Sequence, residues 1–187
     1  MNILAISTSQ LKTGVSAMID DKFYFREFSN KQTGESLRPA VTSLSSQQFN
    51  LVAVDVGPGS YTGGRVGVAF AQGFAQALGI PWVGIDVWTI LDYIAPTDTT
   101  AVTAIRSGEV LIRENGFVIA KPLSEVKRPF GFPNIDPEKY GGVIDPQEQV
   151  PDFCEWMSAL NELAQKPEAE EQLPQYYDRF SHLGKVR

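Results

Sequence analysis

Apolar and polar positions along the first half of the chain alternate between short continuous runs and longer helical patterns. Apolar runs that are typical of buried strands occur five times, and short polar turns join the first three runs, which predicts an antiparallel meander. The five predicted strands are residues 3–7, 15–19, 23–28, 51–56 and 82–85. The continuous apolar character of the fourth strand predicts a covered, central position in the sheet.

Apolar residues at helical spacing separate and follow these strands. The predicted helices are residues 36–46, 62–78 and 87–94. Ser36 is expected to cap the first helix, which would place Pro39 in the first turn, where its missing N–H does no harm. Gly79 is a natural C-cap for the second helix. The order of strands and helices predicts the α/β class, with helices packed on a mixed sheet.

A polar segment at residues 96–100 predicts a boundary between a lobe of residues 1–98 and a smaller lobe of residues 99–187. The smaller lobe is expected to contain a hairpin around Ser107-Gly108, a strand at 117–120, a mostly irregular stretch at 121–151 and a helix at 153–165. Cys154 is the only cysteine and is expected to pack among the apolar residues of that helix.

The overall charge limits the classes of partner. The formal net charge is −6 and no Lys/Arg run is present, so strong direct nucleic-acid binding is not expected. No apolar stretch approaches the length of roughly 18 residues that a membrane span needs, and the start of the chain lacks the pattern of a signal peptide. We therefore expect a cytoplasmic protein without a membrane span.

One motif stands out between the fourth strand and the second long helix. Gly57-Pro58-Gly59-Ser60-Tyr61-Thr62-Gly63 turns the chain, and Arg65 follows inside the helix. This segment resembles the signature of the TsaB (YeaZ) family. Further segments are similar to that family in the same order, namely 3–9, 80–85, 106–110 and, weakly, 173–179.

The resemblance implies an actin-like, ribonuclease H-like fold with two lobes, of which the second is reduced here. It also implies a non-catalytic subunit in the synthesis of threonylcarbamoyladenosine (t6A) on tRNA. The implied partners are TsaD, a catalytic paralogue, and TsaE, a small ATPase, with a homodimer as the alternative assembly. The implied cofactor content is none, with nucleotide bound at most at a shared subunit interface.

The second long helix is apolar on most of its faces, so most of its faces must be covered. Its small residues Ala69, Gly73 and Ala77 are four apart and predict a line along which another helix can approach closely. The alternative is that the first helix covers this face. The family places a subunit interface on these two helices, and the predicted partner-binding residues are Leu37, Val41, Arg65, Ala69, Gln72, Gly73 and Ala77.

The glycine turn has two readings. A turn that leads from a strand into a helix N-terminus presents N–H groups to an anion, so Gly57, Gly59, Ser60 and Thr62 are a candidate phosphate-facing turn. However, the P-loop lysine is missing, and a tight turn at which helix and strand approach closely is the favoured reading.

The competing hypothesis is an enzyme, either an actin-fold nucleotide phosphotransferase or a metal-dependent, glycoprotease-like hydrolase. Ser7 stands where actin-type ATPases commonly carry an aspartate that organises magnesium, and His182 is the only histidine, so a metal-binding histidine pair cannot form. Asp55 and Asp86 lie near strand ends, although isolated carboxylates there are more often structural. We therefore expect no catalytic residue and no metal site.

Overall fold

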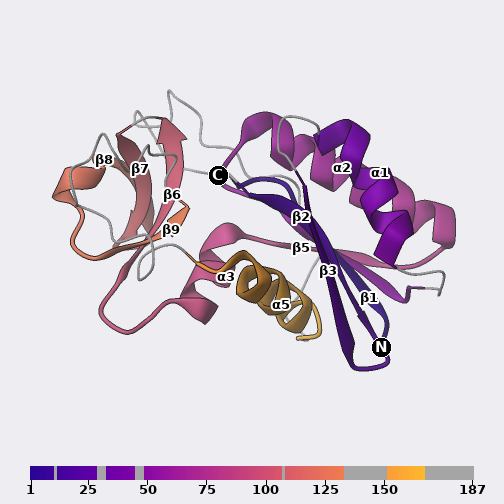
Figure 1. Cartoon of the computed structure of the whole chain (residues 1–187). Helices are drawn as coiled ribbons and strands as arrows, with labels where there is room; N and C mark the ends of the chain where they lie inside the picture. Colours follow the sequence, from indigo (N-terminus) through magenta and orange to yellow (C-terminus); the bar gives the residue numbers. More distant parts are fainter. Residues whose placement is uncertain (11, 29–32, 45–48, 107, 133–150, 167–187) are drawn as a thin grey trace.

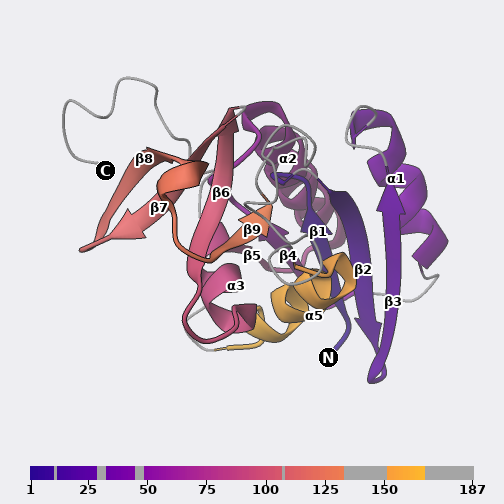
Figure 2. The same cartoon turned by 60° about the vertical axis from the view of Figure 1, so that its left-hand side comes forward.

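Two β-sheets organise the computed structural model, which describes residues 1–10, 12–28, 33–44, 49–106, 108–132 and 151–166 (Figures 1 and 2). The strands of the first sheet are β1 (Ile3–Ser7), β2 (Thr13–Ile19), β3 (Lys22–Phe28), β4 (Leu51–Asp55) and β5 (Trp82–Ile85). Their order is β3-β2-β1-β4-β5, with β1, β2 and β3 antiparallel and β1, β4 and β5 parallel. All five predicted strands and the predicted mixed sheet are confirmed.

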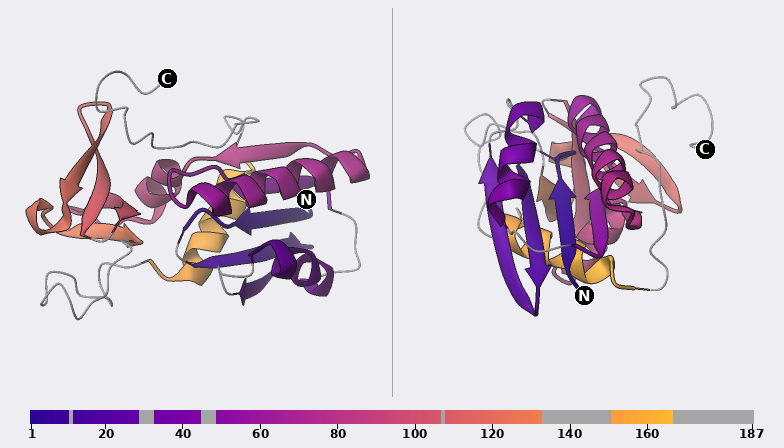
Figure 3. Two further views of the ribbon diagram at one scale, coloured as in Figure 1. Left: turned by 90° about the horizontal axis from the view of Figure 1, so that it is seen from above. Right: turned by 90° about the vertical axis from the view of Figure 1, so that its right-hand side faces the viewer.

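Helices cover both faces of this sheet, which explains why β1 and β4 are buried along their whole length (Figures 1 and 3). The helices are α1 (Thr33–Leu44), α2 (Tyr61–Leu78), α3 (Val87–Ile94) and α5 (Phe153–Leu163). The side chains of α1 and α2 share one core with one face of the sheet, and those of α3 and α5 share a second core with the other face. The predicted α/β class is therefore confirmed.

The start of α1 differs from the prediction. The helix begins at Thr33, so Ser36 does not cap it and Pro39 lies inside the helix. Thr33 is buried together with Leu37 and Val41, at intervals of four residues, so packing on the sheet extends the helix by one turn. Pro39 is on the exposed side, where water can reach the carbonyl that its ring leaves without an N–H partner.

The second sheet has the order β8-β7-β6-β9. Its strands are β6 (Thr100–Arg106), β7 (Glu109–Glu114), β8 (Phe117–Pro122) and β9 (Pro129–Phe132), and a 3-10 turn at Leu123–Glu125 precedes β9. The expectation that residues 121–151 are mostly irregular is wrong where β9 pairs in parallel with β6. These residues form a strand because pairing with β6 buries the apolar ring of Phe130 in a core. Residues 133–150 lie outside the described residues.

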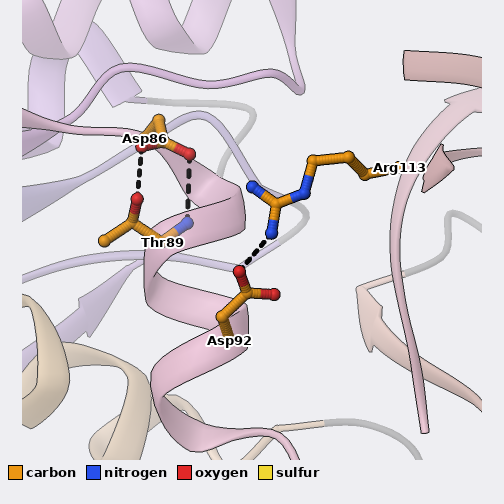
Figure 4. Close-up of polar contacts among 4 residues, drawn as sticks. All are labelled: Asp86, Thr89, Asp92 and Arg113. Atoms are coloured by element: carbon orange, nitrogen blue, oxygen red, sulfur yellow. Dashed lines mark hydrogen bonds and ion pairs between the residues drawn. The ribbon is translucent and has the colours of Figure 1, made fainter. Parts of the chain in front are cut away.

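The two sheets are joined by packing and by charge. Leu111 and Phe130 of the second sheet lie in the same core as α3 and α5. Figure 4 shows Arg113 of β7 paired with Asp92 of α3, and Asp86 capping α3 through Thr89. The predicted division near residue 98 separates the two sheets, but α5 follows that division in sequence and packs on the first sheet.

Two smaller expectations concern single properties of the chain. Cys154 is exposed on α5, so the prediction of a packed thiol is wrong, because the buried face of that helix is formed by Phe153, Trp156 and Met157. Within the described part of the chain, no helix combines the length and the apolar character that crossing a bilayer requires.

The close approach of β9 to β6 gives a test of the second sheet. A Cβ at Gly131 would lie 1.9 Å from the carbonyl oxygen of Val102. We expect Gly131→Ala to lower the free energy of unfolding by about 1–3 kcal/mol, because the two strands must separate. Urea unfolding measures the effect. The control is Gly34→Ala, where nothing lies within 4 Å of the added Cβ, and equal stability of both variants would contradict the described pairing.

Candidate functional site at the start of helix α2

A buried carboxylate lies at the end of β4, directly before the glycine turn. Asp55 is completely buried and accepts hydrogen bonds from the turn that follows β1. The Oγ atoms of Ser7 and Ser9 donate to Oδ2 at 2.7 and 2.9 Å, and the backbone N–H groups of Thr8 and Ser9 donate to Oδ1 at 3.2 Å. Burial raises the pKa of Asp55 above its ordinary value, and these hydrogen bonds act in the opposite direction.

This network extends to the last described helix. The indole Nε1 of Trp156 donates to the Oγ of Ser7 at 3.0 Å, and the side chains of both residues are buried. Trp156 thus fixes the hydroxyl that donates to Asp55. A contact between residues 149 positions apart therefore joins α5 to the end of β1.

The glycine turn and the start of α2 pack directly against that first turn. A Cβ at Gly59 would lie 2.1 Å from the carbonyl oxygen of Ser9, and one at Gly63 would lie 2.0 Å from that of Thr8. The Oγ1 of Thr8 donates to the carbonyl oxygen of Gly63 at 2.8 Å. These glycines are therefore required by close approach, as the favoured reading of the motif predicts.

The second sheet also reaches this turn. The Nε2 of Gln10 donates to the carbonyl oxygen of Pro58 at 3.0 Å, and the Oγ1 of Thr103 lies 3.2 Å from both that oxygen and the Oε1 of Gln10. All three groups are buried. The glycine turn is consequently hydrogen-bonded both to the turn after β1 of the first sheet and to β6 of the second sheet.

A polar pocket of about 340 Å³ opens beside the start of α2. The first turns of α1 and α2 and the turn after β1 contribute its walls, which are lined by Thr8, Gln10, Thr33, Gly34, Ser60, Thr62, Gly63 and Val66. Its polar lining consists of hydroxyl, amide and backbone groups, Val66 adds an apolar side chain, and none of the lining residues is ionisable. Within the described residues, no group of three or more His, Cys, Asp or Glu side chains is placed to hold a metal ion.

The outer face of α2 leads away from this pocket. Arg65, Ala69, Gly73 and Ala77 are exposed along it, and Gln72 is half-buried beside them. Half-buried apolar side chains flank this line, namely Val66, Phe70 and Phe74. Arg65 is the only charged residue of this 18-residue helix.

Comparisons with known protein sequences give partial matches. Residues 35–109 match the family described as TsaD, tRNA N6-adenosine threonylcarbamoyltransferase. A protein of Bacillus subtilis named tRNA threonylcarbamoyladenosine biosynthesis protein TsaB is 37% identical over 89 residues, which are 43% of this chain and 39% of that protein. The chain thus spans well under half of that curated relative.

Solved structures show the same fold over nearly the whole chain. YeaZ from Pseudomonas aeruginosa superposes with a TM-score of 0.64 at 20% identity, covering 94% of this chain and 99% of that one. A second structure, described as an uncharacterized protein with similarity to peptidase YEAZ from the same organism, gives a TM-score of 0.66 at 20% identity, covering 94% of this chain and 98% of that one. At this identity the matches show that the chain shares the fold of these YeaZ structures. The predicted actin-like fold is therefore confirmed.

The predicted partner-binding residues fall into two groups. Five of them, Arg65, Ala69, Gln72, Gly73 and Ala77, lie together on the outer face of α2. Leu37 and Val41 do not join them, because they are only 1% and 4% exposed and pack in the core beneath α1. These two residues therefore do not belong to the surface of the chain.

The predicted phosphate-facing residues are likewise divided. Ser60 and Thr62 line the polar pocket. Gly57 is buried, and Gly59 is pressed against Ser9, so neither glycine is among the lining residues. Ser60 also caps α2 by accepting a hydrogen bond from the N–H of Gly63 at 3.1 Å.

Three other residues of this region have only weak signals in the sequence. Gln10 stands in a polar turn after a strand, where a side chain with both a donor and an acceptor is unremarkable. Trp156 and Thr103 are far away in the sequence, and only the three-dimensional contact shows their role. Asp55 was identified as a strand-end carboxylate, and its structural role agrees with the interpretation favoured for such residues.

The Asp55 network predicts a large stability effect. Replacing Asp55 with Ala leaves two hydroxyls and two backbone N–H groups buried without an acceptor. Each such group costs about 1–3 kcal/mol, so we expect the free energy of unfolding to fall by about 3 kcal/mol or more. The control is Asp86→Ala, which removes only the exposed cap of α3 and should cost about 1 kcal/mol. Denaturant unfolding that gives equal losses would contradict the structural role of Asp55.

Proposed function

We propose that this chain is a non-catalytic partner subunit that docks a TsaD-like paralogue through the outer face of α2 and the neighbouring exposed part of α1. In this role it supports threonylcarbamoylation of adenosine in tRNA. A TsaE-like ATPase joins the pair, and the assembly works in the cytoplasm. The chain carries no cofactor of its own, and nucleotide is bound only where two subunits meet.

The observation that carries this proposal is the exposed glycine in the middle of α2. Gly73 is exposed, and nothing lies within 4 Å of the Cβ that another residue would place there. Glycine inside a helix is less favourable than alanine by about 0.5–1 kcal/mol. Since contacts with the described residues do not require a glycine at position 73, the close approach of another molecule accounts for the small size of this residue.

The surroundings of Gly73 support the same reading. Ala69 and Ala77 extend the exposed small-residue line by one helical turn in each direction, and half-buried Phe70 and Phe74 stack at 5.7 Å beside it. An exposed helix of a soluble protein normally carries several charges on its outer face, whereas α2 carries one. A helix face with so few charges is more typical of a protein interface than of a surface exposed to solvent.

The likeness to the TsaD family supports the choice of partner. The matching residues, 35–109, include nearly all of α1 and the whole of α2. A paralogue with these elements has an equivalent helical layer, and two similar layers can pack about a pseudo-twofold axis as in a homodimer. A second copy of this chain is the competing occupant, and the test below distinguishes it.

The chemistry at the end of β1 supports a non-catalytic role. Ser7 and Ser9 direct their hydroxyls to Asp55, so this carboxylate is fully engaged within the chain and inaccessible. A carboxylate that organises a metal and water around phosphates must instead face the ligand.

Two substitutions at Gly73 test the docking face. Gly73→Ala should raise the free energy of unfolding of the isolated chain by about 0.5–1 kcal/mol, because the position is exposed and helical. Gly73→Trp should leave the chain folded but abolish co-elution with the TsaD-like paralogue of the same genome, since the ring blocks helix approach. Circular dichroism measures folding and stability, and size-exclusion chromatography with light scattering measures formation of the complex.

Glu155→Trp is the matched control, because it adds the same ring at an exposed position of α5, on the opposite face of the first sheet. It should bind the paralogue as the unmodified chain does. Loss of folding in Gly73→Trp, or an unchanged complex, would contradict the proposal. Loss of self-association alone would assign the face to a homodimer.

The non-catalytic role gives a separate prediction. The isolated chain should show no ATPase, peptidase or threonylcarbamoyl-transferase turnover, because Asp55 is buried and position 7 is a serine. Adding the chain to its TsaD-like paralogue should nevertheless raise t6A formation in a reconstituted tRNA assay. Multiple turnovers of ATP by the isolated chain would revive the enzyme hypothesis.

A further inference from the structure

The carboxyl ends of β1 and β4 form the part of the first sheet at which open α/β sheets bind ligands. The chain leaves β1 toward β2 and leaves β4 toward β5, so the direction of the strand order reverses between β1 and β4. Ligands of such sheets bind in the crevice outside the strand ends at this reversal. Here β6 of the second sheet reaches the same place, because the Oγ1 of Thr103 donates to the carbonyl oxygen of Pro58.

The carboxamide of Gln10 lies in this crevice, and Gln10 is only 4% exposed. Its Nε2 donates to the Oγ of Ser9 at 2.9 Å and to the carbonyl oxygen of Pro58 at 3.0 Å. Its Oε1 accepts from the Oγ1 of Thr103 at 3.2 Å. Glutamine and asparagine are the side chains that combine two N–H donors with a carbonyl acceptor in one plane. The groups around the crevice therefore match a carboxamide.

Gln10 is the central link in a chain of hydrogen bonds between the two sheets. The Oγ of Ser9 accepts from Gln10 and donates to Oδ2 of Asp55 at 2.9 Å. The chain thus runs from the buried carboxylate of the first sheet through Ser9 and Gln10 to Thr103 of the second sheet. Successive hydrogen bonds in a buried network polarise and strengthen one another, so loss of the central amide affects both ends.

The polar pocket beside α2 provides an approach to this amide. Gln10 is one of the residues that line that pocket of about 340 Å³. The packing around the amide is close, because a Cβ at Gly59 would lie 2.6 Å from its Nε2. Shortening the side chain of Gln10 therefore joins the crevice to the pocket and opens a path for a small molecule.

We propose that the crevice is a carboxamide-binding site that this chain fills with its own Gln10, whose amide holds β6 of the second sheet against the glycine turn. The position of the glycine turn then depends on an amide of the chain itself. The inference goes beyond the proposed docking function and is independent of it, because no residue of the outer face of α2 takes part.

The test replaces the side-chain amide with a free one. Gln10→Ala removes the atoms that acetamide supplies, and it should lower the Tm of the purified full chain by about 5–10 °C, because buried donors and acceptors lose their partners. Acetamide has four non-hydrogen atoms and can bind only weakly, so it is added at about 100 mM. It should raise the Tm of the variant by about 3 °C or more relative to the unmodified chain, with saturation.

Two controls separate recognition from general solvent effects. N,N-dimethylacetamide has no N–H group and should give no such rise, since the crevice needs donors to Ser9 and Pro58. Gln76→Ala removes an exposed glutamine from α2. It should leave the Tm within about 2 °C of the unmodified chain and should respond to acetamide as that chain does.

A second variant tests the other end of the link. Thr103→Val keeps the shape of the side chain but removes the hydroxyl that donates to Gln10, and it should lower the Tm by about 3–6 °C. Thr100→Val is the matched control on the same strand, at a half-buried position, and should change the Tm by about 2 °C or less.

The outcomes decide the inference without any partner protein. Equal effects of acetamide and dimethylacetamide on Gln10→Ala would overturn it, as would a Gln10→Ala variant as stable as Gln76→Ala. If Gln10→Ala folds only in acetamide, the site is supported. If Gln10→Ala does not fold at all, Thr103→Val decides: a Tm equal to that of Thr100→Val overturns the inference, and a selective loss supports it.

Discussion

The buried carboxylate of Asp55 sets the geometry from which the rest of the site follows. A carboxylate without solvent is costly unless donors surround it, and its raised pKa reflects that cost. The donors come from Ser7, Thr8 and Ser9, so the turn after β1 folds back onto the end of β4. Because Trp156 of α5 fixes the Ser7 hydroxyl, the arrangement is complete only when the last described helix is packed on the sheet.

This constraint determines where α2 begins. The turn after β1 occupies the space in which side chains at Gly59 and Gly63 would lie, so only glycine, which has no side chain, is accommodated at these two positions. The helix then starts at Tyr61 with Ser60 as its cap. Its inner face packs on the sheet through Val68, Ala71 and Ala75, and its outer face is thereby fixed as a surface. A rigid, well-defined helix face of this kind is pre-organised for binding, which limits the entropy that association costs.

Local patterns in the sequence were sufficient for much of the fold. The strands at residues 51–55 and 82–85 and the helix that follows the glycine turn have clear periodicity, so they were predicted correctly. β9 was missed because its four residues lie in a proline-rich stretch and are a strand only through pairing with β6. The start of α1 was missed because the burial of Thr33, which extends the helix, depends on the sheet below it.

The candidate surface shows the same difference between local and distant information. Spacing alone placed Ala69, Gly73 and Ala77 on one face, and that face is exposed. Leu37 and Val41 were assigned to it because they are apolar, but an apolar stripe on a short helix first covers the protein's own sheet. No pattern within α5 indicated that Trp156 binds Ser7, because the contact depends on how distant segments pack.

The residue at position 7 decides how the buried carboxylate of Asp55 is satisfied within the fold. Ser7 Oγ lies 2.7 Å from an oxygen of Asp55. An aspartate at position 7, which actin-type ATPases commonly carry there, would bring two carboxylates close together, and such a pair needs a proton or a cation between them. A serine donates its own hydrogen to Asp55, so the pair is satisfied within the chain. With a serine at position 7, the turn after β1 is held on Asp55 by hydrogen bonds within the chain, and Thr8 of that turn in turn bonds the carbonyl oxygen of Gly63 and supports the start of α2.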